Sequence, residues 1–168
     1  MLKSVLCSFL LTSCIRTAYS ATKKSKKAAA TKSSSNNDAN DRIRLINAKI
    51  SSADVMYLTD SNHSKFISSV SREYTTIAMY TALSKNHQCG VCTSLFPIFA
   101  DVASYYNEQF DFNSSIPRNR LAFFIIDADT AGRTFEMMGI ETVPKFYIYP
   151  PKEINQKLKK DFLEVNNR

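Results

Sequence analysis

The sequence has no run of about 18 apolar residues after residue 20, the length from which a membrane-spanning helix is expected. After residue 20 the sequence therefore offers no candidate for a membrane-spanning helix. It also has no tryptophan and only two histidines, His63 and His87. Because a structural zinc site takes four ligands, the chain offers few residues from which to build one.

Net positive charge is concentrated at the N-terminal end. The formal net charge is +7, of which residues 1–20 carry +2 and residues 21–40 carry +4, leaving +1 for residues 41–168. A nucleic-acid-binding domain carries a basic patch on its folded part. This distribution therefore argues against nucleic acid as a partner, and the 44% of hydrophobic residues is sufficient for the core of one domain.

The first 20 residues have the pattern of a secretory signal peptide. Lys3 gives a positive start, and residues 5–15 are mostly apolar but too few to span a membrane. Small residues stand at Ala18 and Ser20, the two positions that a signal peptidase reads. The alternative interpretation of this segment is a buried N-terminal helix.

Cleavage of a signal peptide would change the cysteine content. A cut before Ala21 removes Cys7 and Cys14 and leaves Cys89 and Cys92. The secretory pathway is an oxidising compartment, in which cysteines form disulfides. The mature chain would therefore carry one pair of cysteines, two residues apart.

Residues 21–41 are a low-complexity run of Lys, Ala, Ser and Asn without an apolar face. Such a segment buries too little apolar surface to offset the entropy of ordering. We predict a disordered linker at 21–41 and a folded domain at 42–168, whose C-terminal part is incomplete if the chain is a fragment.

The apolar pattern of the folded part alternates between strands and helices. We expect strands at residues 54–58, 74–83, 121–127 and 144–151, and helices at residues 42–50, 60–70, 92–108 and 130–140. Residues 152–168 fit either an edge strand or a helical tail. This alternation predicts an α/β fold with a central mixed sheet flanked by helices.

Local details complete this prediction. We expect Asp60 or Ser61 to cap the second helix, Gly139 to end the last one, and Pro97 to kink the long helix or end its first turn. The long helix should bury one apolar face. That face contains Leu95, Phe96, Phe99, Val102, Ala103 and Tyr106. The aromatic residues of the strands belong to the core on this interpretation, namely Tyr80, Phe123, Phe124, Tyr147 and Tyr149.

Cys89 and Cys92 are expected on the first turn of that helix, after a buried strand, which is the thioredoxin-like arrangement. A helix N-terminus stabilises a thiolate and lowers the pKa of a cysteine from about 8.5. We expect Cys89 to be the attacking nucleophile and Cys92 the resolving thiol of a Cys89–Cys92 disulfide. A metal site and a purely structural disulfide are the competing interpretations. We favour redox work, because zinc lacks ligands and so short a loop gains little stability.

Pro144 supports a thioredoxin-like fold, in which the strand beside the active site opens with a cis-proline. We therefore predict a cis Val143–Pro144 bond whose backbone lines a groove for an extended peptide. Two features depart from ordinary thioredoxins. Gln88 precedes Cys89 where they have tryptophan, and no acidic residue lies between residues 74 and 101. Both argue against a fast general reductase.

Three blocks in order, "TAL…CGVC", "F-P" and "FEMMGIETVPK", resemble a known family. It is the luminal thioredoxin-like domain of the oligosaccharyltransferase subunits, namely the yeast third and sixth subunits and their animal magnesium-transporter-associated relatives. The resemblance covers about residues 41–151. It implies that Cys89 tethers cysteine-bearing nascent polypeptides by a mixed disulfide, that Cys92 releases them, and that Val143 and Pro144 line the groove.

The resemblance also implies a place and partners. It implies the lumen of the endoplasmic reticulum, the other oligosaccharyltransferase subunits as partners, and promotion of N-glycosylation. Members of that family carry membrane helices after this domain, so the resemblance implies that the chain is either a fragment or a short variant without the anchor. Membrane association is then expected only through a region missing from this chain. We expect no metal and no cofactor. Asn62 and Asn113 are N-glycosylation sequons, and Phe96 or Phe99 is a candidate for the peptide groove.

Two other functions stay open. One is a free-standing disulfide isomerase or oxidase of the secretory pathway. The other is a peptide-binding adaptor whose cysteines only regulate its groove.

Overall fold

The computed structural model describes residues 37–50, 55–68, 71–112, 119–152 and 162–165. The predicted signal peptide, most of the predicted linker and the sequon at Asn113 lie outside these residues. Residues 39–168 form one compact unit. Among the helices described, none is both long and apolar enough to cross a membrane.

A five-stranded mixed sheet forms the centre of this unit. Its strands are β1 (Met56–Leu58), β2 (Thr75–Thr81), β3 (Leu121–Asp127), β4 (Lys145–Tyr149) and β5 (Leu163–Glu164). In space the order is β1-β3-β2-β4-β5. The strands β1, β3 and β2 are parallel, and β4 and β5 are antiparallel to their neighbours. β5 shows that the C-terminal segment contributes an edge strand, one of the two expected outcomes.

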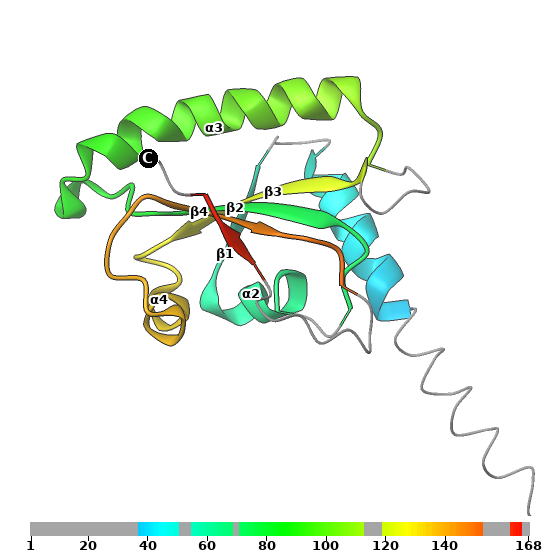
Figure 1. Cartoon of the computed structure of the whole chain (residues 1–168), viewed down its shortest axis with the longest axis horizontal. Coiled ribbons are helices and arrows are strands. Elements are labelled where there is room, and N and C mark those ends of the chain that lie inside the picture. Colours follow the sequence, from blue (N-terminus) through cyan, green and yellow to red (C-terminus); the bar gives the residue numbers. More distant parts are fainter. Residues whose placement is uncertain (1–36, 51–54, 69–70, 113–118, 153–161, 166–168) are drawn as a thin grey trace, which may run out of the picture. The chain divides into compact units, whose positions relative to one another are not determined.

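Helices cover both faces of the sheet. They are residues 37–50, α2 (Asp60–Phe66), α3 (Gly90–Gln109) and α4 (Gly132–Met138), with a 3-10 turn η1 (Lys85–His87) before α3. Figure 1 shows α3 on one face, and α2 and α4 on the other. This is the thioredoxin-like α/β fold that the sequence predicted.

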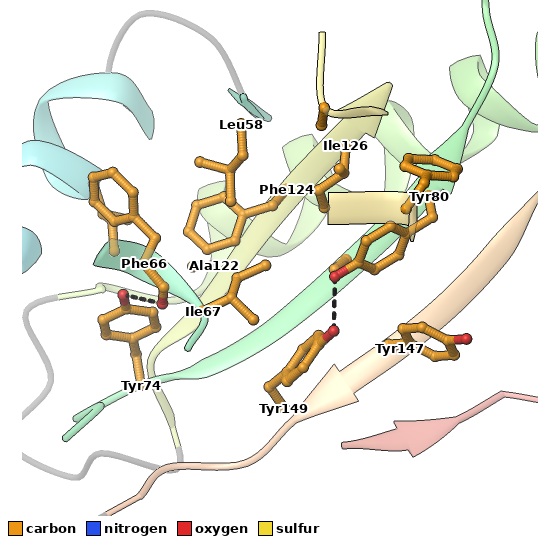
Figure 2. Packing of buried hydrophobic residues seen from close by; sticks show 14 of the residues in the cluster. Leu58, Phe66, Ile67, Tyr74, Tyr80, Ala122, Phe124, Ile126, Tyr147 and Tyr149 are labelled. Atoms are coloured by element: carbon orange, nitrogen blue, oxygen red, sulfur yellow. Dashed lines mark hydrogen bonds between the residues drawn. The ribbon is translucent and has the colours of Figure 1, made fainter. Parts of the chain in front are cut away.

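The two faces of the sheet form two clusters of buried side chains. The cluster under α2 and α4 is rich in tyrosine. Within it, the hydroxyls of Tyr80 and Tyr149 form a hydrogen bond of 2.7 Å (Figure 2). The cluster under α3 is centred on Phe99, whose ring contacts Phe123 of β3 and Phe146 of β4. The strand aromatics that the sequence assigned to the core are all buried.

The linker prediction ended too late. Residues 37–41 are helical, and Ala39 is buried. Composition alone assigned them to the linker, but Ala39, Arg42 and Ile46 share one helix face and are all buried. The first helix therefore includes residues 37–41, ahead of the residues that its apolar pattern indicated.

The predicted cap of α2 was also wrong. Thr59 is the N-cap, and its backbone N–H donates to Asn62 Oδ1 at 2.8 Å. The Asp60 carboxylate instead accepts hydrogen bonds from Arg133 N, Thr134 N and Thr134 Oγ1 at the start of α4. These hydrogen bonds outweigh the desolvation of Asp60, so its pKa lies below the ordinary value.

The long helix begins at Gly90, two residues earlier than expected, and continues through Pro97, which does not end its first turn. Phe99 and Ala103 are buried as predicted, but Val102 is 53% exposed. The predicted face was too wide, because one helix resting on a sheet buries a narrower stripe than a helix surrounded by others.

Candidate active site

Cys89 and Cys92 form a disulfide, with their Cα atoms 5.3 Å apart. Cys89 is the N-cap of α3 and is half-buried, whereas Cys92, one turn into the helix, is 0% exposed. Of the two cysteines, only Cys89 is accessible to solvent.

The helix N-terminus is directed at Cys89. The backbone N–H of Cys92 donates to the Cys89 Sγ at 3.2 Å. The first turn of α3 contains no acidic residue that would oppose a negative sulfur. Free N–H groups and the partial positive charge of a helix N-terminus stabilise a thiolate at such a position.

A sharp turn connects β2 to α3. Ser84 caps η1 by accepting a hydrogen bond from Asn86 N at 3.3 Å. Gln88 then adopts a left-handed conformation, with φ of 49°. A non-glycine residue adopts this conformation at a cost, so the surrounding contacts must hold the turn in place.

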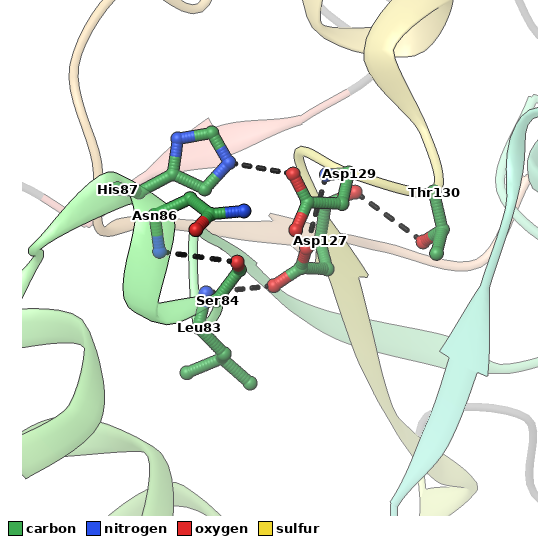
Figure 3. A network of polar contacts seen from close by, with 7 residues as sticks. All are labelled: Leu83, Ser84, Asn86, His87, Asp127, Asp129 and Thr130. Atoms are coloured by element: carbon green, nitrogen blue, oxygen red, sulfur yellow. Dashed lines mark hydrogen bonds and ion pairs between the residues drawn. The ribbon is translucent and has the colours of Figure 1, made fainter.

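Those contacts come from the end of β3 and the loop that follows it (Figure 3). The Asp127 carboxylate accepts hydrogen bonds from Leu83 N at 2.8 Å and from Asp129 N at 3.0 Å. His87 Nε2 lies 2.6 Å from Asp129 Oδ1. Hydrogen bonding to His87 lowers the pKa of Asp129 below its ordinary value. Both ends of the segment before Cys89 are thus tied to the same strand end.

The sequence around the cysteines does not reveal this network, because no acidic residue lies between residues 74 and 101. Asp127 is buried and acts on that segment from a strand more than 40 residues away, through a 2.8 Å bond to Leu83 N. The available signal was the pair of aspartates in "IIDAD", directly after an apolar strand.

The bond between Val143 and Pro144 is cis, in agreement with the prediction. Lys145, the next residue, pairs with Tyr80 near the end of β2. The register therefore places the Val143–Pro144 bond at the end of the sheet from which the chain leaves toward Cys89. Both residues are partly exposed.

The remaining predicted positions have mixed outcomes. Asn62 is partly exposed on α2, where its Oδ1 accepts the Thr59 N–H. Phe99 is buried and Phe96 is partly buried against Tyr57, with ring centroids 6.3 Å apart. Phe99 is therefore unavailable as a groove residue, because its ring belongs to the core under α3. Among the described residues, no group of three or more His, Cys, Asp or Glu side chains is placed to hold a metal ion.

The chain is therefore a thioredoxin-like domain. It carries a Cys-x-x-Cys disulfide at the start of its long helix. Residues 44–167 match the family described as "OST3 / OST6 family, transporter family". The chain belongs to this family.

Curated relatives support the same assignment. The chain is 30% identical over 98 residues to "Dolichyl-diphosphooligosaccharide--protein glycosyltransferase subunit MAGT1" of Xenopus laevis, covering 58% of this chain and 28% of the relative. It is 28% identical over 109 residues to subunit 3 of the same-named enzyme of Schizosaccharomyces pombe, covering 65% of this chain and 33% of the relative. The matched part of the chain thus spans about a third or less of these relatives.

Among solved structures, full-length ERdj5 matches with a TM-score of 0.52 and 12% sequence identity. The match covers 75% of this chain and 16% of that one. At this identity the likeness shows the fold alone.

Proposed function

We propose that this chain is the luminal thioredoxin-like domain of an oligosaccharyltransferase subunit in the endoplasmic reticulum. In this role it is a thiol–disulfide oxidoreductase that captures nascent polypeptides and so promotes their N-glycosylation. The observation that carries the proposal is the half-buried Cys89 joined to the fully buried Cys92 at the start of α3. Family membership and the names of the curated relatives support it.

Capture follows from this asymmetry. A client thiolate attacks the Cys89 Sγ; a bond forms between the client sulfur and Cys89, and the Cys89–Cys92 bond breaks. Cys92 leaves as a thiolate and takes up a proton. Release reverses the step, because the Cys92 thiolate attacks the Cys89 Sγ, re-forms the disulfide and frees the client thiolate. If a second client thiolate attacks the client sulfur instead, the client leaves oxidised and the pair is reduced.

The predicted groove residues have a supporting role in this scheme. The cis Val143–Pro144 bond lies at the sheet end that leads to Cys89. Its partly exposed backbone offers hydrogen-bonding groups to an extended client segment. The half-buried state of Cys89 then admits a flexible polypeptide more readily than a folded one.

The experiment is a trapping series in secretory-pathway membranes. In Cys92→Ser, the Cys89 thiolate attacks a client disulfide, and the mixed disulfide persists because no resolving thiol remains. We expect adducts that reducing agent releases, enriched in polypeptides with glycosylation sites, and none with the matched Cys89→Ser variant. Glycan occupancy of the same clients should fall in Cys89→Ser.

The outcomes separate the alternatives. Adducts with a broad range of clients and unchanged glycan occupancy would favour a free-standing isomerase or oxidase. Normal occupancy in both cysteine variants, with occupancy lost on substitution of Val143, would favour the adaptor.

A further inference from the structure

The long helix α3 has a second apolar stripe that the sheet does not cover. Val91, Ile98, Val102 and Tyr105 are exposed by 53% to 67% of their surfaces. With the partly buried Leu95 between them, they recur at alternating steps of four and three residues. This is the spacing by which one helix packs along another.

Nothing polar interrupts the start of this stripe. The hydroxyls of Thr93 and Ser94 each donate to the Gly90 carbonyl at 2.9 Å. Both are thus turned back onto the helix itself. From Val91 to Tyr105 the stripe rises about 21 Å, at 1.5 Å per residue.

The direction of the stripe follows from its neighbours on the helix. Each residue of a helix is rotated by about 100° around the helix axis from the residue before it. Around the axis of α3, Phe99 therefore lies between Phe96 on one side and the apolar stripe on the other. Phe96 contacts Tyr57 on β1, and Phe99 contacts Phe146 on β4. The stripe therefore faces the far side of α3 from β1, above the β4–β5 edge of the sheet.

That edge of the sheet is itself apolar and exposed on the same face. Phe146 points toward α3, so Ile148, two residues on, shares its face. Leu163 pairs with Ile148 and is 64% exposed, and Val165 follows on the same face at 48%. The charged pair of Lys145 and Glu164 takes the opposite face, because both alternate with these apolar residues.

The exposed stripe of α3 and the exposed apolar face of the β4–β5 edge together form a surface that we call the α3–β5 corner. It consists of Val91, Ile98, Val102 and Tyr105 on α3 with Leu163 and Val165 at the sheet edge. Isolated exposed apolar residues are ordinary, but a set gathered on neighbouring elements is typical of an interaction surface. A helix fits beside another at an interaxial distance of about 8–10 Å.

Charge decides what kind of helix fits. The charged residues of α3 are Asp101 and Glu108, and the helix contains no lysine or arginine. Two copies of this chain joined along α3 would bring acidic helices together, which is unfavourable. An anionic lipid surface is disfavoured for the same reason.

We propose that the α3–β5 corner binds an amphipathic helix of a partner polypeptide, apolar along one stripe and basic beside it. The partner's apolar side chains cover Ile98, Val102 and Leu163. Its lysines or arginines lie beside Asp101 and Glu108. This proposal does not depend on the redox function of Cys89.

The test titrates the 168-residue chain with a synthetic helical peptide of 18 residues that has leucines at heptad positions and flanking lysines. We expect one peptide bound per chain, measured by calorimetry. A peptide of the same length with flanking glutamates should bind about tenfold more weakly. Ile98→Asp and Leu163→Asp should each weaken binding at least about tenfold, a loss of about 1.4 kcal/mol.

The matched control is Met137→Asp, because Met137 is 78% exposed on α4. It should leave binding unchanged, and circular dichroism verifies that each variant is folded. A charge reversal, Asp101→Lys with Glu108→Lys, should invert the preference between the two peptides.

Two results would overturn the proposal. Absence of binding by the lysine-flanked peptide shows that the corner takes no helix of this chemistry. A dimer of the free chain in sedimentation experiments that Ile98→Asp dissociates shows that a second copy is the occupant. If the Cys92→Ser variant traps no client, the proposed redox function is contradicted, but the proposal for the α3–β5 corner is not. The two proposals can therefore be refuted independently.

Discussion

At the scale of single residues, the His87 side chain anchors the turn that leads into Cys89. Its bond to Asp129 Oδ1 at 2.6 Å restrains the turn at Gln88, where φ is 49°. Without that restraint the open dithiol form gains conformational freedom. The disulfide of the pair should then be less favoured.

We expect His87→Ala to lower the equilibrium constant for forming the Cys89–Cys92 disulfide by about two- to fivefold, a modest effect because the two side chains are 39% and 47% exposed. Equilibration with glutathione buffers, read out by thiol alkylation, measures this constant. His87→Gln keeps a hydrogen-bonding group and should restore most of it. An effect of His87→Ala that persists unchanged in an Asp129→Ala background would contradict the role given to this contact.

His63 provides a prediction about pH. It is buried, with Nε2 3.0 Å from the Tyr80 hydroxyl, and burial lowers its pKa although Asp60 opposes the shift. The unfolded chain therefore binds a proton near about pH 6.5, before the folded chain does. Stability from this group is complete above that pH and is lost as the pH falls below it.

Urea unfolding between pH 7.5 and 5 measures this loss. We expect the free energy of unfolding to decrease over that range in the wild type and to decrease less in His63→Gln, which does not titrate. Parallel profiles of the two proteins would show that another group is responsible.

At the scale of elements, the end of α4 depends on one backbone conformation. Gly139 has φ of 63° and donates its N–H to the Glu136 and Phe135 carbonyls. A Cβ added there would meet no atom within 4 Å. The cost of a side chain at this position is therefore the left-handed backbone alone.

Gly139→Ala should lower the free energy of unfolding by about 1–2 kcal/mol, measured by denaturant titration. Gly139→Asn should cost less, because asparagine tolerates this conformation. Gly132→Ala is the control: it also has open space but no positive φ, and it lies within the helix, so it should be neutral or stabilising. Equal losses from the two alanine variants would refute the explanation.

At the scale of the whole molecule, Arg72 joins segments that are far apart in the sequence. Arg72 is 1% exposed, and its guanidinium donates to the carbonyls of Ile67 and Pro150 and lies over the ring of Tyr149. Its backbone exchanges two hydrogen bonds of 2.8 Å with Lys152. One side chain thus fixes the end of the α2 segment to the end of β4.

Arg72→Met should lower the free energy of unfolding by about 2–4 kcal/mol, because it leaves buried carbonyls without donors. Urea denaturation measures the loss. Arg44→Met, at an 82% exposed side chain, should change stability by less than about 0.5 kcal/mol. A loss of similar size in both variants would show that the effect does not arise from the contacts of the buried Arg72 side chain.

Elements with a local signal could be predicted from the sequence alone. The bounds of β3 follow from an uncharged apolar run, the end of α4 follows from Gly139, and the Cys89–Cys92 disulfide follows from the spacing of its cysteines. Each of these signals lies within a few residues, and propensity or spacing expresses it directly.

The pairings between residues far apart in the sequence could not be predicted before the fold was known. Asp60 was free to cap its own helix but binds the start of α4, 74 residues away. Asp127 binds Leu83 across 44 residues, and Val102 is exposed because α3 rests on the sheet with a different face. These contacts depend on which polar groups lie close to a free N–H in the folded chain and on which face of a helix packs against the sheet. The local sequence pattern specifies neither of these, because both are set by the tertiary fold.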